Sequence, residues 1–151
     1  MLDGSPPFLS GWGLIDVVHT AARTANDEIV WLIVDAVESD ALPPEVLRLH
    51  ASLALGVASR CCRLLGPSPL DEELAALRTD LDDLRPVTAA RRAAAGELAV
   101  RAAAALAASA GSRTLLRSDQ AQRLWREALF VLVYALRPAS RDALLARLGA
   151  A

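Results

Sequence analysis

The sequence predicts a mainly α-helical protein: an antiparallel four-helix up-down bundle with a short fifth helix, preceded by an N-terminal β-hairpin. Near residue 40 the spacing of apolar residues changes from a period of about two, typical of strands, to about 3.6, typical of helices. Hydrophobic residues make up 54% of the 151 residues and aromatic residues only 4%, so Ala, Leu and Val must form the core. We therefore expect a hairpin segment at residues 1–40 and a helical bundle at residues 41–151.

The hairpin is predicted from two runs that are rich in β-branched residues. These runs lie at residues 12–22 and 28–37, and residues 24–27 form the turn between them. The second run is apolar on both faces, and a two-stranded hairpin cannot bury two apolar faces by itself. We therefore expect the helices of this chain, or a second chain, to cover it.

Pro, Gly and Ser residues set the predicted ends of the first two helices. The first helix should begin near Pro43 and end before Gly66, because Pro is tolerated in a first turn and Gly is favoured just after a last turn. The second helix should be capped by Ser68, with Pro69 as its first residue. Pro86 should kink this helix or separate it from the third. The apolar stripe of the second helix consists of Leu70, Leu74, Leu77, Leu81 and Leu84.

The third and fourth helices carry the clearest helical signals. Residues 88–116 are very rich in Ala, which favours helix and permits close approach of neighbouring helices. Gly111 and Ser112 should loosen or end this helix. Short connections between the helices predict antiparallel neighbours.

Residues 118–148 have the densest apolar pattern in the chain. Ser118 should cap the fourth helix, and Pro138 should break it after Arg137. The pattern predicts a helix that is buried on most of its circumference, with a narrow polar edge. Its apolar residues are Leu124, Leu129, Phe130, Val133, Tyr134 and Leu136. The short fifth helix follows, through Leu144, Leu145 and Leu148.

Charge and cysteine content limit the function classes. The net charge is −2, and all 16 basic residues are Arg, scattered among carboxylates. There is thus no electrostatic reason to expect a nucleic acid or an anionic membrane as partner. No signal peptide is expected, and Arg or Glu should interrupt each apolar segment short of a membrane span. We expect a cytoplasmic protein in which the adjacent Cys61 and Cys62 are reduced, buried thiols.

Few residues predict a metal, catalytic or ligand site from the sequence alone. His19 and His50 have no metal-ligand spacing with Cys or carboxylates, so we interpret them as surface or structural histidines. The acidic groups at residues 71–73 and 80–83 fit a helix N-terminus and a solvated face without a metal. Tyr134 can serve as a core residue or as a ligand contact. The tryptophans are interpreted as packing residues: Trp12, Trp31 and Trp125.

Several segments together resemble one enzyme family. A helix carrying LGVASR, a long Ala-rich helix, a Gly-Ser turn and RLWREALFVLVYALRP follow one another within residues 53–148. In this order they resemble the C-terminal helical domain of the acyl-CoA dehydrogenase family. The N-terminal DGSPPFLSGWG also resembles part of that family's central β-domain, where a segment lies against the flavin. Arg126 and Glu127 match family positions that make structural ion pairs.

The resemblance implies an FAD site and names residues for it. Phe8 matches a Trp beside the isoalloxazine ring, and Ser10 matches a Thr that hydrogen-bonds the flavin. Gly111 and Ser112 match a Gly-Gly pair whose backbone approaches the cofactor of a neighbouring subunit. Without this analogy, residues 109–112 would be interpreted as an ordinary helix C-terminus.

Two matched positions lack the family's functional group. Ala108 replaces a Gln that contacts the adenine-nucleotide part of the flavin. Ala135 replaces the Glu that removes the substrate α-proton, and residues 53–60, where some branches place the base, contain no carboxylate. Loss of a positioned base typically costs about 10²–10⁴-fold in rate. We therefore expect no competent dehydrogenase in this chain alone.

Three functions follow from these observations. The chain is expected to be a truncated acyl-CoA dehydrogenase-like subunit, acting in flavin-linked acyl-thioester oxidoreduction as a homo-oligomer or with a full-length partner. The alternative is a non-catalytic oligomerisation module that kept the family's association surface. A third function is a small-ligand or cyclase-type pocket inside the bundle.

Overall fold

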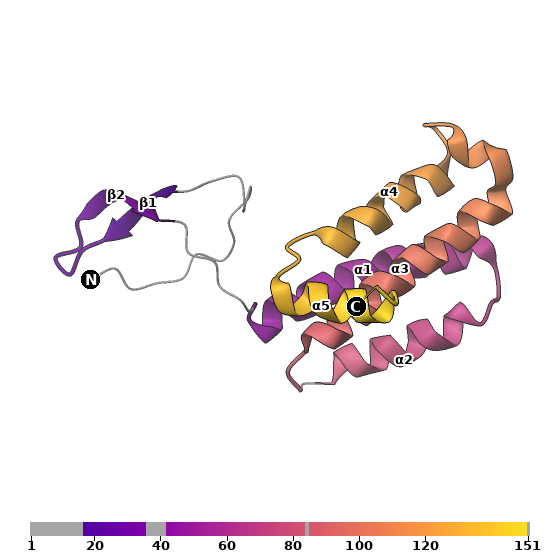
Figure 1. Ribbon diagram of the computed structural model, residues 1–151, viewed down its shortest axis with the longest axis horizontal. Helices are drawn as coiled ribbons and strands as arrows, with labels where there is room; N and C mark the ends of the chain where they lie inside the picture. Colours follow the sequence, from indigo (N-terminus) through magenta and orange to yellow (C-terminus); the bar gives the residue numbers. More distant parts are fainter. Residues whose placement is uncertain (1–16, 36–41, 84, 151) are drawn as a thin grey trace. The chain divides into compact units, whose positions relative to one another are not determined.

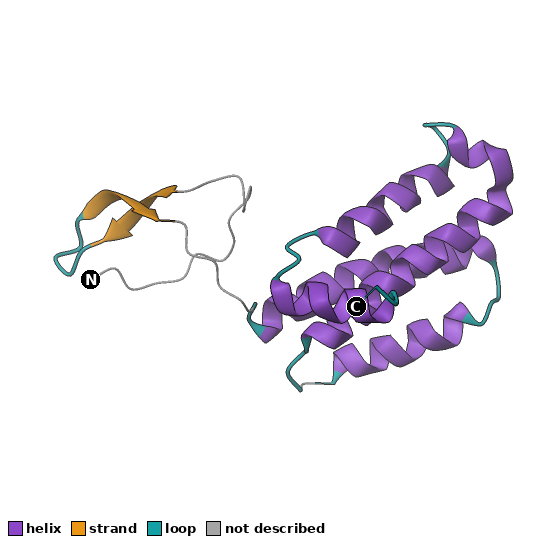
Figure 2. Ribbon diagram, in the orientation of Figure 1, coloured by secondary structure: helices purple, strands orange, loops and turns teal. Residues whose placement is uncertain are grey.

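The computed structural model describes residues 17–35, 42–83 and 85–150 (Figures 1 and 2). It confirms the predicted fold class, because a two-stranded antiparallel sheet precedes a bundle of α-helices. The chain divides into two compact units, Met1–Ser39 and Asp40–Ala151, and each is described by itself.

The first unit contains the predicted hairpin. Strand β1 (Val17–Arg23) pairs with β2 (Ile29–Asp35), with Val17 opposite Asp35 and Arg23 opposite Ile29. The predicted turn is confirmed: the Thr24 amide donates to the Glu28 carbonyl at 2.8 Å. β1 ends one residue later and β2 begins one residue later than predicted. Residues 12–16 of the first predicted run and 36–37 of the second lie outside the described part.

The hairpin leaves large apolar side chains of β2 uncovered. Trp31 is 67% exposed, and Ile29 and Ile33 on the same face are also exposed. Trp31, which was predicted to be a packing residue, is thus mostly exposed in the described hairpin.

The second unit is a helical bundle in which α3 (Ala89–Ala110) contacts every other helix. Helices α1 and α3 run in one direction, and α2 and α4 run in the opposite direction on either side of them (Figure 1). Ala side chains at the α1–α3 contact let the two helices pack closely. The other helices are α1 (Pro44–Leu65), α2 (Leu70–Asp82), α4 (Gln120–Val133) and α5 (Pro138–Arg147), with the 3₁₀ helix η1 (Gly111–Leu115) before α4.

Most predicted helix ends are confirmed, but two caps are wrong. Gly66 and Gly111 end α1 and α3, both with positive φ. Ser68 does not cap α2: it lies before the N-cap Pro69, and its amide donates to the Asp71 carboxylate at 2.8 Å. Asp119, not Ser118, caps α4 by accepting a bond from the Ala121 amide at 2.8 Å, since its carboxylate is favoured at the positive end of the helix.

The predicted burial of α4 on most of its circumference is wrong. One narrow stripe, Ala121, Leu124 and Ala128, is buried against α3 and α1. Leu129, Phe130 and Val133 are 41%, 58% and 58% exposed, because α4 lies at the edge of the bundle. The helix also ends at Val133, earlier than the predicted break at Pro138, which instead begins α5.

Candidate functional site

The residues implicated by the sequence lie at the two opposite ends of α4. Gly111 and Ser112 lie in the turn that leads from α3 into η1, before the start of α4. Ala135 lies in the turn that follows the end of α4. A 14-residue helix is about 21 Å long, so the structure does not bring these residues together.

The Gly111–Ser112 turn adjoins a largely apolar pocket. Gly111 has φ 61, a left-handed conformation that strains any residue with a Cβ, and both residues of the turn are exposed. The pocket has a volume of about 440 Å³, within the usual range for part of a small-molecule site. It lies where α3, η1 and α4 meet and is lined by Ala104, Ala107, Thr114, Leu115, Gln122 and Trp125.

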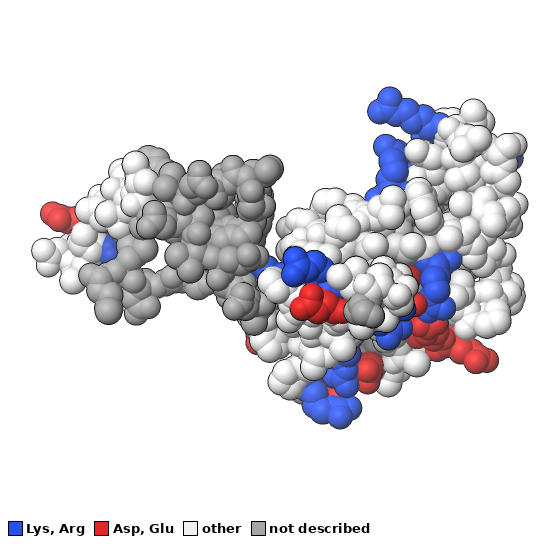
Figure 3. Space-filling view, in the orientation of Figure 1, with Lys and Arg blue, Asp and Glu red and all other residues white. Residues whose placement is uncertain are grey.

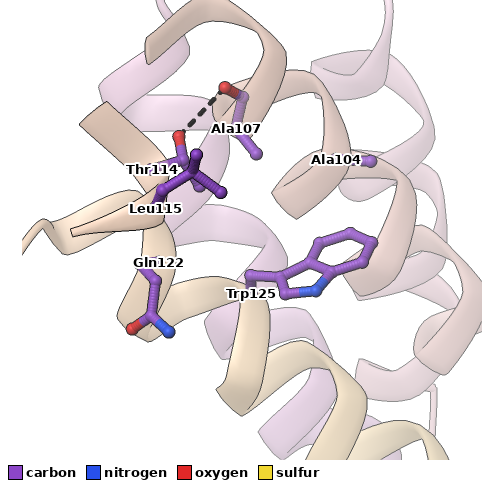
Figure 4. A pocket seen from close by; sticks show the side chains of 6 residues that line it. All are labelled: Ala104, Ala107, Thr114, Leu115, Gln122 and Trp125. Carbon is purple, nitrogen blue, oxygen red and sulfur yellow. Dashed lines mark hydrogen bonds between the residues drawn. The ribbon is translucent and has the colours of Figure 1, made fainter. Parts of the chain in front are cut away.

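The polar side chains of Thr114 and Gln122 and the indole of Trp125 line the pocket (Figure 4). Thr114 is used internally, because its hydroxyl donates to the Ala107 carbonyl at 3.0 Å. The Gln122 Oε1 atom is buried and has no hydrogen-bond partner among the described residues. The Trp125 ring extends from α4 toward the α3 residue Ala104, and it also packs on the core, as predicted. The pocket thus offers an aromatic surface, with the Gln122 side chain in its lining.

The other end of α4 is held by a buried arginine. Arg92 of α3 is 2% exposed. Its guanidinium donates to the carbonyls of Leu132 at 2.9 Å, Tyr134 at 2.8 Å and Val131 at 3.3 Å. These are carbonyls that a helix leaves unpaired at its C-terminus, where the dipole also favours a cation. Burial lowers the pKa of Arg92, and these carbonyls compensate its charge.

The Ala135 side chain carries no proton acceptor, and Arg92 contacts the turn in which Ala135 lies. Ala135 has φ 48, which an Ala side chain tolerates only with strain. The preceding Tyr134 is half-buried and accepts from Arg92 through its carbonyl. This environment holds the helix end in place, and it contains no candidate base at Ala135.

His50 joins the same cluster from α1. Its ring meets the Tyr134 ring edge-on with centroids 5.1 Å apart, and Phe130 stacks on Tyr134 at 5.0 Å. The His50 Nδ1 atom is buried without a hydrogen-bond partner among the described residues. Burial, and then the charge of Arg92, lower the pKa of His50. The structural interpretation of this histidine agrees with its packing on Tyr134.

The lowered pKa of His50 predicts loss of stability in mild acid. The unfolded histidine takes up a proton near its ordinary pKa of about 6.5, before the folded one does. The free energy of unfolding should therefore fall as the pH drops below that value, until the folded pKa is passed. Urea denaturation of the chain at pH 7.5 and pH 5 measures the loss. His50→Gln should reduce the pH dependence; equal dependence in the wild type and this variant contradicts the assignment.

The two cysteines are free and buried, as predicted. Burial raises the pKa of Cys61 to about 11, with smaller contributions from Cys62 and Glu127, and burial also raises the pKa of Cys62. A thiol is a nucleophile only as thiolate, so these cysteines serve packing.

Two of the acidic residues of α2 form ion pairs. Glu73 pairs with Arg101, and Asp80 pairs with Arg91 at 3.1 Å. Within the described ranges no three His, Cys, Asp or Glu side chains gather as a metal site. Glu127 pairs with Arg123 at 3.3 Å.

Sequence reasoning did not identify Arg92 or the Gln122–Trp125 pocket. The only sequence signal for Arg92 was a charged residue in an otherwise Ala-rich apolar helix. Phe8 and Ser10, the other two predicted flavin contacts, lie outside the described residues, as does Trp12. His19 lies in β1.

One described stretch, Ala89–Leu115, is long and apolar enough to cross a membrane by length and composition alone. Charged residues do interrupt this stretch, as expected: Arg91, Arg92, Glu97 and Arg101 lie within it. Half of the apolar window is buried inside the bundle. No family model, no curated protein and no solved structure matches this chain.

Proposed function

We propose that this chain is an acyl-CoA dehydrogenase-like subunit that covers the flavin of a partner chain and takes part in acyl-thioester oxidoreduction only within that complex. The observation that carries the proposal is the exposed Gly111–Ser112 turn beside an apolar pocket of about 440 Å³. These are the two residues that the family resemblance assigns to the approach of a neighbouring subunit's cofactor.

Two side chains at this end of α4 support the proposed contact with FAD. The Trp125 ring offers a surface for stacking a planar aromatic group. Gln122, whose buried Oε1 atom has no hydrogen-bond partner in the described bundle, contributes an amide side chain to the pocket lining. The family resemblance matches Ala108 to a Gln, and Ala108 has no amide side chain. Gln122 has one, and it lies close to the Gly111–Ser112 turn.

The proposal assigns the chemistry to the complex. The flavin supplies the hydride acceptor when bound, and a base must take the α-proton of the thioester. Ala135 offers no base. A partner chain must therefore contribute it, and the role of this chain is to bind and to shield the cofactor.

The test is flavin uptake by the purified chain, alone and with a full-length acyl-CoA dehydrogenase-like partner. We expect visible flavin absorbance to remain with the protein in the mixture after gel filtration. Ser112→Trp should abolish it by blocking the turn, because Ser112 is exposed and its replacement disturbs no core. Ser52→Trp, the same change at an exposed serine of α1, is the control. Protein that stays colourless in every mixture overturns the proposal.

A second candidate function is a non-catalytic association module. It is favoured by the exposed apolar residues Leu129, Phe130 and Val133 on the outer face of α4. Contiguous apolar residues on a surface often mark a protein interface. Sedimentation of the chain at micromolar concentration tests it, and a monomer at all concentrations overturns it.

A further inference from the structure

The outer faces of α2 and α4 are two of the helix faces that the bundle leaves exposed. Each of these helices packs on α1 and α3, and α2 and α4 do not contact each other in the described bundle (Figure 1). They lie on opposite sides of the α1–α3 pair, so a single chain cannot join the two faces.

The two faces are complementary in size. On α4, the large apolar side chains of Leu129, Phe130 and Val133 project outward. On α2, the outward residues are small and exposed: Ala75, Ala76 and Thr79. A flat face of small residues lets large side chains of another helix pack against it closely.

The two faces are also complementary in charge. Arg126 on α4 is exposed and forms no ion pair among the described residues. Glu72 on α2 is exposed and likewise unpaired there. Figure 3 shows basic side chains projecting from the α4 edge of the bundle and acidic side chains gathered near the start of α2.

The spacing of the charged and apolar positions is the same on both helices. On α4 the apolar residues follow Arg126 after three, four and seven positions, and on α2 the small residues follow Glu72 after the same intervals. Positions at these intervals share one face of a helix. When the two helices lie side by side in parallel, Glu72 faces Arg126 and the small residues face the large ones.

We infer that the chain associates with a second copy of itself head to tail, with the outer face of α4 in one copy seated on the outer face of α2 in the next. Such an interface uses two different surfaces, so it continues into a ring or a filament instead of closing as a symmetric pair. The inference deepens the association-module function and rests on it; it is independent of flavin binding.

A charge exchange between two variants tests this pairing. Glu72→Arg or Arg126→Glu alone places like charges at every interface, and we expect each variant to associate about tenfold more weakly at low salt. In an equimolar mixture, each variant meets an opposite charge on the other at both of its faces. Association should therefore return in the mixture. Sedimentation velocity at several concentrations measures the assembly.

Matched controls are available on α1. Glu45→Arg makes the same change in the first turn of a helix, and Arg63→Glu reverses an exposed arginine. Both lie outside the proposed faces and should leave association unchanged, and circular dichroism checks that every variant is folded. A wild-type chain that is monomeric overturns both the association function and this pairing. A wild type that associates while Glu72→Arg has no effect, or a mixture that fails to recover, overturns the pairing alone.

Discussion

Replacing Arg92 by methionine is expected to lower the free energy of unfolding by about 3 kcal/mol or more, because three buried carbonyls lose a charged donor. These are the carbonyls of Val131, Leu132 and Tyr134 at the end of α4. Methionine keeps most of the volume of the side chain, so the loss reports the hydrogen bonds and not a cavity. Urea denaturation monitored by circular dichroism measures it.

The neighbouring arginine is the control for this prediction. Arg91 forms a partly exposed ion pair with Asp80, and Arg91→Met should cost less than about 1 kcal/mol. If Arg92→Met does not fold, Arg92→Lys should give an intermediate stability, since a lysine keeps the charge and cannot reach all three carbonyls. Equal losses for the two methionine variants would show that the cap at the end of α4 is not a major contribution to stability.

Replacing Leu124 by alanine is expected to cost about 2–5 kcal/mol, through lost apolar burial and the cavity left behind. Leu124 is 1% exposed and is among the largest fully buried side chains. It packs in the same core cluster as the small residues of α1 and α3, which have no side-chain length with which to fill the space. Thermal and urea unfolding at low protein concentration measure the change.

Leu129 provides the same substitution on the opposite side of the same helix. It is 41% exposed, and Leu129→Ala should cost less than about 1 kcal/mol in the monomer. The variant should instead weaken self-association, because Leu129 belongs to the outer face of α4. If Leu129→Ala destabilises the dilute chain as much as Leu124→Ala does, the orientation of α4 described above is incorrect.

The candidate site was predictable only where a local signal marked it. Gly111 was expected to end the long Ala-rich helix, and it does so with a positive φ. The pocket beside it was not predictable, because Ala104, Leu115 and Trp125 come from three elements that meet only in the fold. For the same reason Arg92 could not be assigned as a cap of α4: its partners are about forty residues further along the chain.

The errors at helix caps and at α4 have different physical causes. Ser118 and Asp119 are adjacent and both are good capping residues, so the choice depended on where the backbone first turns. The period of the apolar residues in α4 was identified correctly. Periodicity shows which residues share a face but not whether a neighbouring helix covers that face.

By itself, the sequence determined the succession of a hairpin and five helices, the turn between the strands, and the glycine ends of α1 and α3. These features depend on interactions between residues close in the chain: propensity, capping and turn conformation. Only the tertiary structure decided that Arg92 holds the end of α4, that Trp125 and Gln122 line a pocket, and that Phe130 and Val133 remain exposed. Burial and long-range hydrogen bonds depend on which elements become neighbours, and this is set by the packing of α1, α3 and α4 together.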